Sequence, residues 1–171
     1  VEIKQYAGKN LRTLVPRVIG QKVVPLPPTP RWDEATLIGD IAARHGQEAA
    51  NVAKKLVDWG KSNSLRLQWG KAARVGSCYL TLDHQGNSNH CFAVWTWGQV
   101  GIPFRYMRAP FDDEAKRLEL LGRLNTIPSI DLPADSVARL PRFPLSALSD
   151  AESLEQFLKT FDWVIDEIRA T

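Results

Sequence analysis

Three closely spaced runs of β-branched and aromatic residues constrain the fold of this chain most strongly. They cover residues 75–82, 90–97 and 99–106. Such residues suit a pleated, half-buried surface, and the polar cluster at 83–89 and Gly98 are typical of tight turns. A shorter run at residues 65–69 precedes them. The sequence therefore predicts four consecutive antiparallel strands.

Alternation along these strands sorts their side chains onto two faces. One face is almost wholly apolar and is expected to form the core: Cys78, Leu80, Leu82, Phe92, Val94, Val100, Ile102, Phe104 and Tyr106. The other is mixed and aromatic: Tyr79, Thr81, Ala93, Trp95, Trp97, Gln99, Gly101 and Arg105. A hairpin that turns at Gly98 would place Gly101 across from Trp95 and leave space beside the indole ring.

The aromatic face allows three interpretations. A second helical layer could cover it, which would make Trp95 and Trp97 ordinary core residues. Alternatively, Tyr79, Trp95 and Trp97 form a stacking platform beside Arg105, which would suit bases or another planar ligand. The third interpretation is a protein–protein contact patch. The sequence leaves all three open.

Helical periodicity predicts two helices before the sheet. Asp33 is a suitable N-cap for the first, which is expected to end at Gly46, and the second covers residues 47–61. A helix pair of this kind also occurs in DNA-binding helix-turn-helix motifs. The second helix mixes its lysines with Glu48 and Asp58, so packing against the sheet is the better interpretation.

Two more helices are predicted after the sheet, over residues 113–124 and from residue 150 onward. The first should turn Leu118, Leu121 and Leu124 inward. The second follows a capping box formed by Ser149 and Glu152, and carries a continuous apolar stripe. Residues 125–148 are rich in proline and are predicted to lack regular secondary structure. The predicted fold class is α+β, with a four-stranded antiparallel meander sheet flanked by two N-terminal and two C-terminal helices.

Proline also indicates the domain organisation. Residues 22–31 hold four prolines, which predicts a stiff, extended linker and a domain boundary. Residues 32–171 form the predicted α+β domain. The strand pattern at residues 1–6 starts without a preceding turn, as expected for a piece of a longer protein.

Composition narrows the functional classes. The net charge of +3 is uneven, since residues 66–108 carry five Lys or Arg and only one acid, Asp83. This imbalance fits an anionic partner, and it fits an ordinary solvated surface equally well. The absence of a membrane span or secretory signal favours a cytoplasmic protein with no membrane partner. Two thiols not placed opposite each other agree with a reducing compartment, because Cys78 should face Val94 and Cys91 should face Thr81.

Metal chemistry has one candidate motif. Glu2-Ile3-Lys4 is an E-x-K sequence on a predicted strand, where alternation puts Glu2 and Lys4 on the same face. In metal-dependent phosphodiesterases the carboxylate helps to hold Mg²⁺, and the lysine orients water and stabilises phosphate charge. A zinc site from Cys78, His84, His90 and Cys91 is not expected, because no CxxC or HxxxH pair is present.

The segment VEIKQY…GKNLRTLVPRVIGQ resembles the end of the catalytic core of PD-(D/E)XK, restriction-endonuclease-like nucleases. Residues 65–168 are similar to a C-terminal domain of unknown function in bacterial proteins of this kind, through WGK…GSCYLTLDHQG…FAVWTWGQVGIPFRY and FLKTFDWVIDEI. The resemblance implies that residues 1–21 are the tail of a truncated nuclease-like core. It makes Glu2 and Lys4 catalytic residues and Glu2 a ligand of Mg²⁺. The first acid of the nuclease motif has no counterpart here, so Mg²⁺ is expected only in a complete core, and no cofactor for residues 32–171.

The sequence thus predicts an accessory domain of a prokaryotic nuclease-like protein, which binds nucleic acid or senses a modified base in DNA defence or restriction. The expected contact residues are Lys71, Arg74, Tyr79, Trp95, Trp97 and Arg105. The alternative is a module that binds a protein or a small ligand without any nucleic-acid contact. An active nuclease within this chain is a third hypothesis, and it requires an acid supplied from elsewhere.

Overall fold

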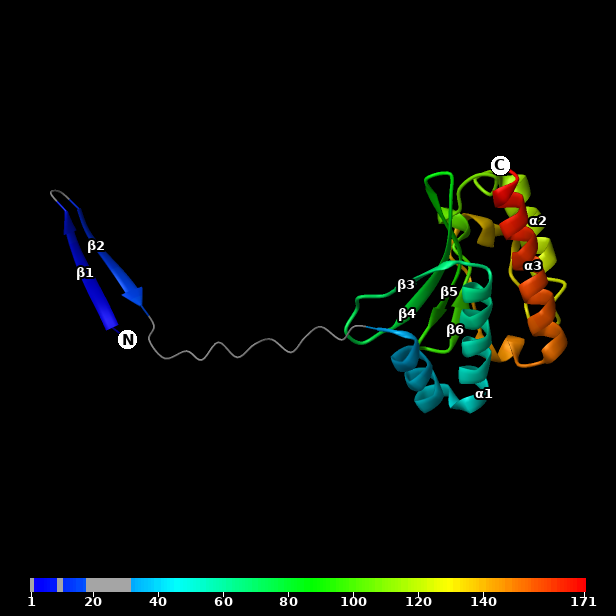
Figure 1. Cartoon of the computed structure of the whole chain (residues 1–171), viewed down its shortest axis with the longest axis horizontal. Coiled ribbons are helices and arrows are strands. Elements are labelled where there is room, and N and C mark those ends of the chain that lie inside the picture. The colour runs from blue at the N-terminus through cyan, green and yellow to red at the C-terminus, as the bar shows by residue number, and fades with distance from the viewer. Residues whose placement is uncertain (1, 9–10, 18–31) are drawn as a thin grey trace.

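The computed structural model describes residues 2–8, 11–17 and 32–171, the first two ranges by their backbone (Figure 1). Strands β1 (Glu2–Gly8) and β2 (Leu11–Arg17) pair in antiparallel fashion as a separate two-stranded sheet. The predicted linker at residues 22–31 lies outside the described residues. The remaining elements belong to the segment 32–171.

A five-stranded antiparallel meander organises this segment, in the order β3-β4-β5-β6-β7. The strands are β3 (Arg66–Trp69), β4 (Ser77–His84), β5 (Asn87–Trp95), β6 (Gln99–Gly101) and β7 (Arg142–Pro144). The prediction of four strands missed β7, which lies in the stretch expected to be irregular. This strand has three residues and ends in a proline, which an edge strand tolerates because one side of its backbone is not paired.

The pairing of β4 with β5 follows the predicted register at one end only. Cys78 lies opposite Val94, as expected. A bulge at Leu80/Thr81 then shifts the register, so that Thr81 lies opposite His90 and not opposite Cys91. A bulge adds one residue to one strand, and here it lets the Cys91 side chain join the core while His90 stays half-buried on the other face.

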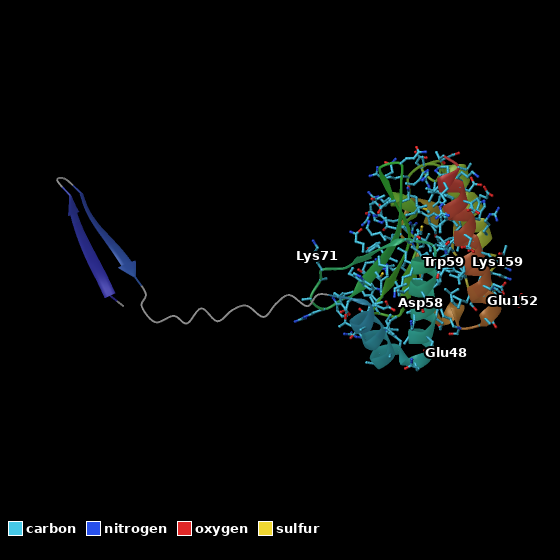
Figure 2. The ribbon with its side chains drawn as sticks, in the orientation of Figure 1. Glu48, Asp58, Trp59, Lys71, Glu152 and Lys159 are labelled. Atoms are coloured by element: carbon cyan, nitrogen blue, oxygen red, sulfur yellow. The ribbon has the colours of Figure 1, made fainter. Side chains whose placement is uncertain are left out.

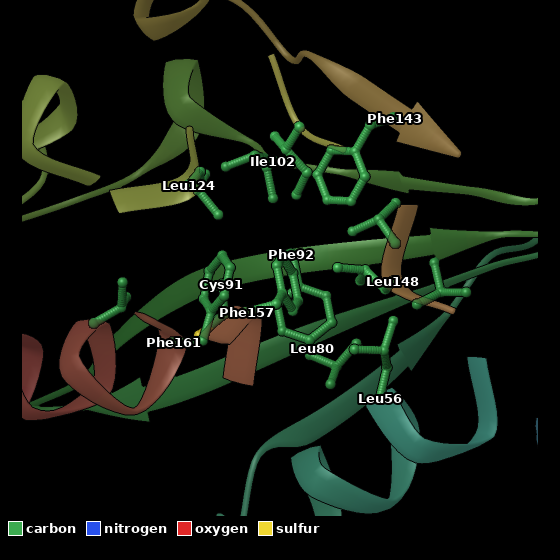
Figure 3. Close-up of a cluster of buried hydrophobic side chains, with 14 of the residues drawn as sticks. Leu56, Leu80, Cys91, Phe92, Ile102, Leu124, Phe143, Leu148, Phe157 and Phe161 are labelled. Atoms are coloured by element: carbon green, nitrogen blue, oxygen red, sulfur yellow. The ribbon is translucent and has the colours of Figure 1, made fainter. Parts of the chain in front are cut away.

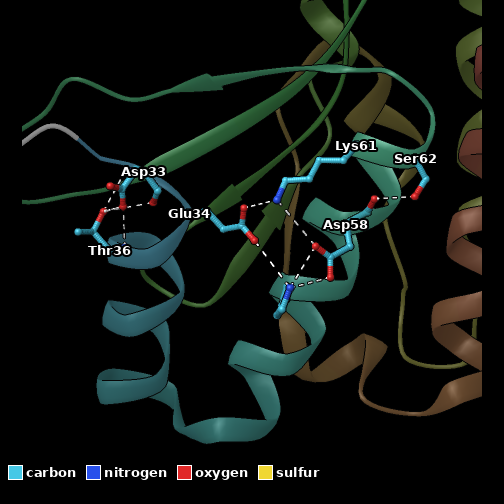
Figure 4. Close-up of polar contacts among 7 residues, drawn as sticks. Asp33, Glu34, Thr36, Asp58, Lys61 and Ser62 are labelled. Atoms are coloured by element: carbon cyan, nitrogen blue, oxygen red, sulfur yellow. Dashed lines mark hydrogen bonds and ion pairs between the residues drawn. The ribbon is translucent and has the colours of Figure 1, made fainter.

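One helical element, α1 (Glu34–Ser62), takes the place of the two predicted N-terminal helices. Asp33 caps it as expected, and the backbone leaves the helix at Gly46 with φ 87° and ψ 168°, which favours glycine. The chain folds back at this kink (Figure 4). Glu34 of the first half forms ion pairs with Lys54 and Lys61 of the second half. The break was therefore predicted at the right residue, but the helix resumes directly.

The two C-terminal helices are present as predicted, at α2 (Glu114–Leu124) and α3 (Ala151–Arg169). Two details of the prediction were wrong. Asp150, not Ser149, is the N-cap of α3, with its carboxylate accepting a hydrogen bond of 3.0 Å from the Ser153 backbone N–H. Leu118 is 43% exposed, because the inward face of α2 is set by its neighbours Leu120, Leu121 and Leu124.

The core lies between the sheet and helices α1 and α3, which both contact β4 (Figure 1). Its centre is an aromatic cluster in which the Phe92 ring lies 5.1 Å from Phe157 and 4.8 Å from Phe161, between ring centroids (Figure 3). All three side chains are fully buried, and such edge-on aromatic contacts stabilise beyond the area that they bury. Short 3-10 helices at Phe104–Tyr106, Ala134–Ala138 and Leu145–Leu148 connect the larger elements. Among the described helices, none has the length and apolar character needed to cross a bilayer.

Candidate functional site

The apolar side chains of β4 and β5 belong to the core that α1 and α3 cover, so the aromatic side chains that alternate with them lie on the opposite face of the sheet. Trp97 is 40% exposed and Tyr79 and Trp95 are half-buried. The interpretation in which a helical layer seals these rings is therefore wrong. Tyr106, expected on the apolar face, is 58% exposed, because the 3-10 turn at Phe104–Tyr106 ends the strand alternation after Gly101.

Four rings form a continuous row on this face, which we call the aromatic stripe: His90, Tyr79, Trp95 and Trp97. Successive ring centroids are 5.7, 5.6 and 5.1 Å apart. The two tryptophans are stacked with 28° between their planes, whereas Tyr79 meets Trp95 edge-on. The structure thus brings together three of the predicted contact residues.

Gly101 leaves room for the Trp95 ring beside the stripe. Gly101 pairs with Ala93 and not with Trp95, which lies opposite Gln99. A Cβ atom on Gly101 would lie 3.2 Å from the indole Nε1 of Trp95, so the ring itself fills the space that the sequence predicted to be open. The Nε1 atom is buried without a hydrogen-bond partner among the described residues.

Arg142 was missed by sequence reasoning. It lies opposite Gly101 on β7, and its guanidinium carbon is 5.4 Å from the Trp95 ring centroid and 5.1 Å from that of Trp97. The predicted Arg105 lies instead over the Tyr106 ring, at 5.9 Å. The only sequence signal for Arg142 is its place next to Phe143 in a Pro-flanked segment, where alternation gives Arg and Phe opposite faces.

A pocket of about 430 Å³ opens beside the stripe. Tyr79, His90, Tyr106, Pro103 and Leu140 provide its aromatic and apolar walls, and Ser88 and Arg108 are its polar members. Backbone hydrogen bonds on either side hold the Leu140 segment in place. The Ile102 N–H donates to the Pro141 carbonyl, and the Arg105 N–H donates to the Arg139 carbonyl.

Two titratable side chains in the pocket have pKa values shifted from their ordinary values. Burial raises the pKa of Tyr79, and the positive charge of Arg142 opposes this effect. Burial also lowers the pKa of His90, helped by the positive charges of Arg66 and Arg108, while Asp83 acts in the opposite direction. His90 Nδ1 lies 2.9 Å from the buried Thr81 hydroxyl, which fixes the ring orientation. At neutral pH the pocket therefore holds a neutral imidazole and a neutral phenol.

Positive charge near this face is not neutralised. Five cations form no ion pair with any acid within residues 32–171: Lys71, Arg74, Arg105, Arg108 and Arg142. Eight of the eleven other Lys and Arg side chains of this segment do form one. A cation without an acidic partner can attract a negatively charged ligand with its whole charge. The aromatic face is thus bordered by free guanidinium groups.

The predicted basic loop leaves the sheet at the same end as Trp97. Gly76 exchanges hydrogen bonds of 3.0 Å with Thr96, the residue before Trp97. Trp32 donates a hydrogen bond of 2.7 Å from its indole to the Ala72 carbonyl and thereby fixes the loop. Lys71 projects from it into solvent (Figure 2). Arg74 is also exposed.

The residues predicted for metal chemistry belong to the separate two-stranded sheet. Glu2 and Lys4 belong to β1, opposite Arg17 and Val15 of β2. The described part of the chain contains no group of three His, Cys, Asp or Glu residues placed to hold a metal ion. Cys78 and Cys91 are buried free thiols, and burial raises the pKa of each to about 12. Neither is suited to act as a thiolate ligand at neutral pH.

Comparisons of the chain with protein-family models, with curated proteins and with solved structures find no match. The resemblance to restriction-endonuclease-like nucleases stays a prediction. The candidate site is therefore defined by its own geometry: an exposed aromatic stripe, a guanidinium over its tryptophans, and a pocket at its Tyr79 end.

Proposed function

We propose that residues 32–171 form a nucleic-acid-binding domain that holds a single strand along the aromatic stripe. The observation that carries this proposal is the stacked and partly exposed pair Trp95–Trp97 beneath Arg142. A base stacked on an exposed aromatic side chain contributes about 1–3 kcal/mol to binding, whatever its identity. The guanidinium adds a cation above the same surface.

A single strand fits this face better than a duplex does. Stacking on protein rings requires bases that are not already stacked within a helix. Arg108 lines the pocket at the Tyr79 end of the stripe, and Arg105 lies over Tyr106 of the same pocket. Lys71 and Arg74 are exposed on the loop that Gly76 joins to Thr96, the residue before Trp97, so cations are available to phosphates at both ends of the stripe. In contrast, lysines on the helical side are already paired with acids, as Lys54 is with Asp58 on α1 and Lys159 is with Glu155 on α3 (Figure 2).

The parent protein is proposed to be nuclease-like, with this domain as its accessory part in DNA defence or restriction, where it could also sense a modified base. In a complete core, Glu2 and a second acid would hold Mg²⁺, and Lys4 would stabilise phosphate charge. Mg²⁺-dependent cleavage that disappears in Lys4→Ala would support this role. Cleavage that persists in Lys4→Ala would contradict it.

The binding proposal is tested with a fluorescently labelled single-stranded oligonucleotide and anisotropy. Trp97→Ala is expected to weaken binding by about 5- to 150-fold, because one stacking contact is lost. Leu118→Ala is the matched control, since Leu118 is exposed to a similar degree but lies on α2. Equal affinities of the wild type and Trp97→Ala would exclude the stripe as a nucleic-acid surface.

A protein-interaction or small-ligand module without nucleic-acid contact is the second candidate. The pocket of about 430 Å³ favours it, since sites for small molecules typically measure about 300–1,000 Å³. This candidate predicts binding that added salt does not weaken. Strand binding that falls steeply with salt would count against it.

A further inference from the structure

We propose that the pocket beside Tyr79 accepts one nucleotide unit, with its base between Tyr79 and Tyr106 and its phosphate at Arg108. The inference rests on the proposed function, in which a strand follows the aromatic stripe. The pocket adds to this function a site where one nucleotide leaves the bases stacked on the tryptophans and is recognised individually. The same chemistry would also admit a free mononucleotide.

The walls of the pocket suit a flat heterocycle. Tyr79 and Tyr106 contribute rings, Pro103 and Leu140 contribute apolar surface, and the volume is about 430 Å³. Pockets that bind small molecules combine mostly apolar and aromatic walls with a few placed polar groups. Tyr106 is 58% exposed and has the Arg105 guanidinium near its ring, so a base beside it would lie within reach of a second cation.

His90 offers a hydrogen bond toward the base. Its Nδ1 is engaged by Thr81, whereas its Nε2 has no partner among the described residues and is not a buried atom. A neutral imidazole has one donor and one acceptor nitrogen, and the Thr81 hydroxyl can rotate to suit either tautomer. Nε2 can therefore meet an acceptor or a donor on a base edge.

The Ser88 hydroxyl is not assigned to base recognition, because it is already hydrogen-bonded within the protein. Its hydroxyl donates to Asp83 at 2.7 Å and accepts from Arg66 at 3.0 Å. Arg66 also pairs with Asp83 at 2.6 Å, so this triad is satisfied internally. The polar groups of the pocket that remain available are the His90 imidazole, the Arg108 guanidinium and the phenol hydroxyls of Tyr79 and Tyr106.

Arg108 is placed to bind phosphate. Its only side-chain hydrogen bond among residues 32–171 runs over 3.2 Å from Nη1 to the Asn87 side-chain oxygen. That bond orients the guanidinium and leaves its second terminal nitrogen free. Hydrogen bonds from arginine to phosphate are charge-assisted and about twice as strong as neutral ones. A base without phosphate would lose this interaction.

The pocket is continuous with the stripe, because Tyr79 belongs to both. Its ring meets Trp95 at 5.6 Å on one side and His90 at 5.7 Å on the other. Neighbouring nucleotides of one strand could therefore stack on the tryptophans and enter the pocket. This continuity connects the individual recognition of one nucleotide to strand binding.

The test uses adenosine monophosphate, adenosine and inorganic phosphate in calorimetric titrations of the wild type, Tyr106→Ala and Arg108→Gln. The wild type is expected to bind the nucleotide at least about tenfold more tightly than adenosine, and Arg108→Gln is expected to abolish that difference. Tyr106→Ala should weaken both by about 5- to 150-fold. Arg44→Gln, an exposed charge change on α1, is the control.

Strand binding by the same variants separates the two proposals. If Trp97→Ala weakens it but Tyr106→Ala and Arg108→Gln do not, the pocket inference is overturned and the stripe stands. If the nucleotide binds at the pocket but no strand binds, the pocket is a mononucleotide site and the strand proposal fails. Binding of inorganic phosphate as tightly as the nucleotide would overturn recognition of the base. Because Tyr106 and Arg108 are both exposed, their variants are expected to fold, which circular dichroism checks.

Discussion

Arg142 lies over the indole of Trp97, with 5.1 Å between its guanidinium carbon and the ring centroid. The two residues are distant in the sequence and meet because β7 pairs with β6 at the sheet edge. A cation over an exposed aromatic ring contributes roughly 0.5–1 kcal/mol. The contact thus holds a charged, planar group on the surface where we propose that bases stack.

Neutralising Arg142 is expected to reduce the salt dependence of strand binding. Each phosphate contact with a single strand contributes about 0.7 to the slope of log affinity against log salt. Arg142→Gln should lower the slope by about that amount, as measured by anisotropy at several salt concentrations. Lys159→Gln on α3, whose charge is already paired with Glu155, is the control and should leave the slope unchanged. An unchanged slope in Arg142→Gln would place the strand away from this residue.

Stability is expected to decline in mildly acidic solution because of His90. Its pKa is lowered from 6.5 in the folded state, mainly by burial, so the unfolded chain binds the proton more readily. The free energy of unfolding is therefore fully retained above pH 6.5 and falls as the pH drops toward the lowered folded pKa.

His90→Asn should reduce this decline, because asparagine can reach the Thr81 hydroxyl but does not titrate. Urea unfolding between pH 5 and 8 measures the effect. His45→Asn, an exposed histidine on α1, should keep the decline of the wild type. A decline of equal size in His90→Asn would assign the effect to another group.

Two glycines in helices provide a paired test of packing. A Cβ on Gly60 would overlap the buried Leu80 side chain, whereas a Cβ on Gly122 has no atom within 4 Å. Gly60→Ala is expected to destabilise by about 1–3 kcal/mol through overpacking. Gly122→Ala should stabilise by up to about 1 kcal/mol, because alanine is the better helix former. Denaturant unfolding measures both, and a Gly60→Ala variant at least as stable as the wild type would contradict this packing of α1 on β4.

The start of α3 can be tested in the same way. Asp150→Ala removes the carboxylate that accepts from the Ser153 N–H and should cost about 0.5–2 kcal/mol. Ser149→Ala should change stability by less than about 0.5 kcal/mol, because Ser149 is not the cap. A larger loss of stability in Ser149→Ala than in Asp150→Ala would indicate that Ser149 is the N-cap, as the sequence predicted.

Local patterns were sufficient for much of the fold. The strands β3 to β6, the helices α2 and α3, and the break at Gly46 follow from hydrophobic periodicity and turn residues, which act over a few positions. Alternation also placed Tyr79, Trp95 and Trp97 on one face. These features were predictable because each depends on neighbours in the sequence.

The rest depended on contacts between distant segments. The three residues of β7 are too few to show a period, so Arg142 could be placed only by pairing with β6. The bulge that sets His90 beside Thr81 likewise reflects the packing of Cys91 into the core. The sequence by itself determined an α+β sheet with an aromatic face. Only tertiary packing decided that this face stays open, which guanidinium covers its tryptophans, and where its pocket lies, because these depend on long-range burial.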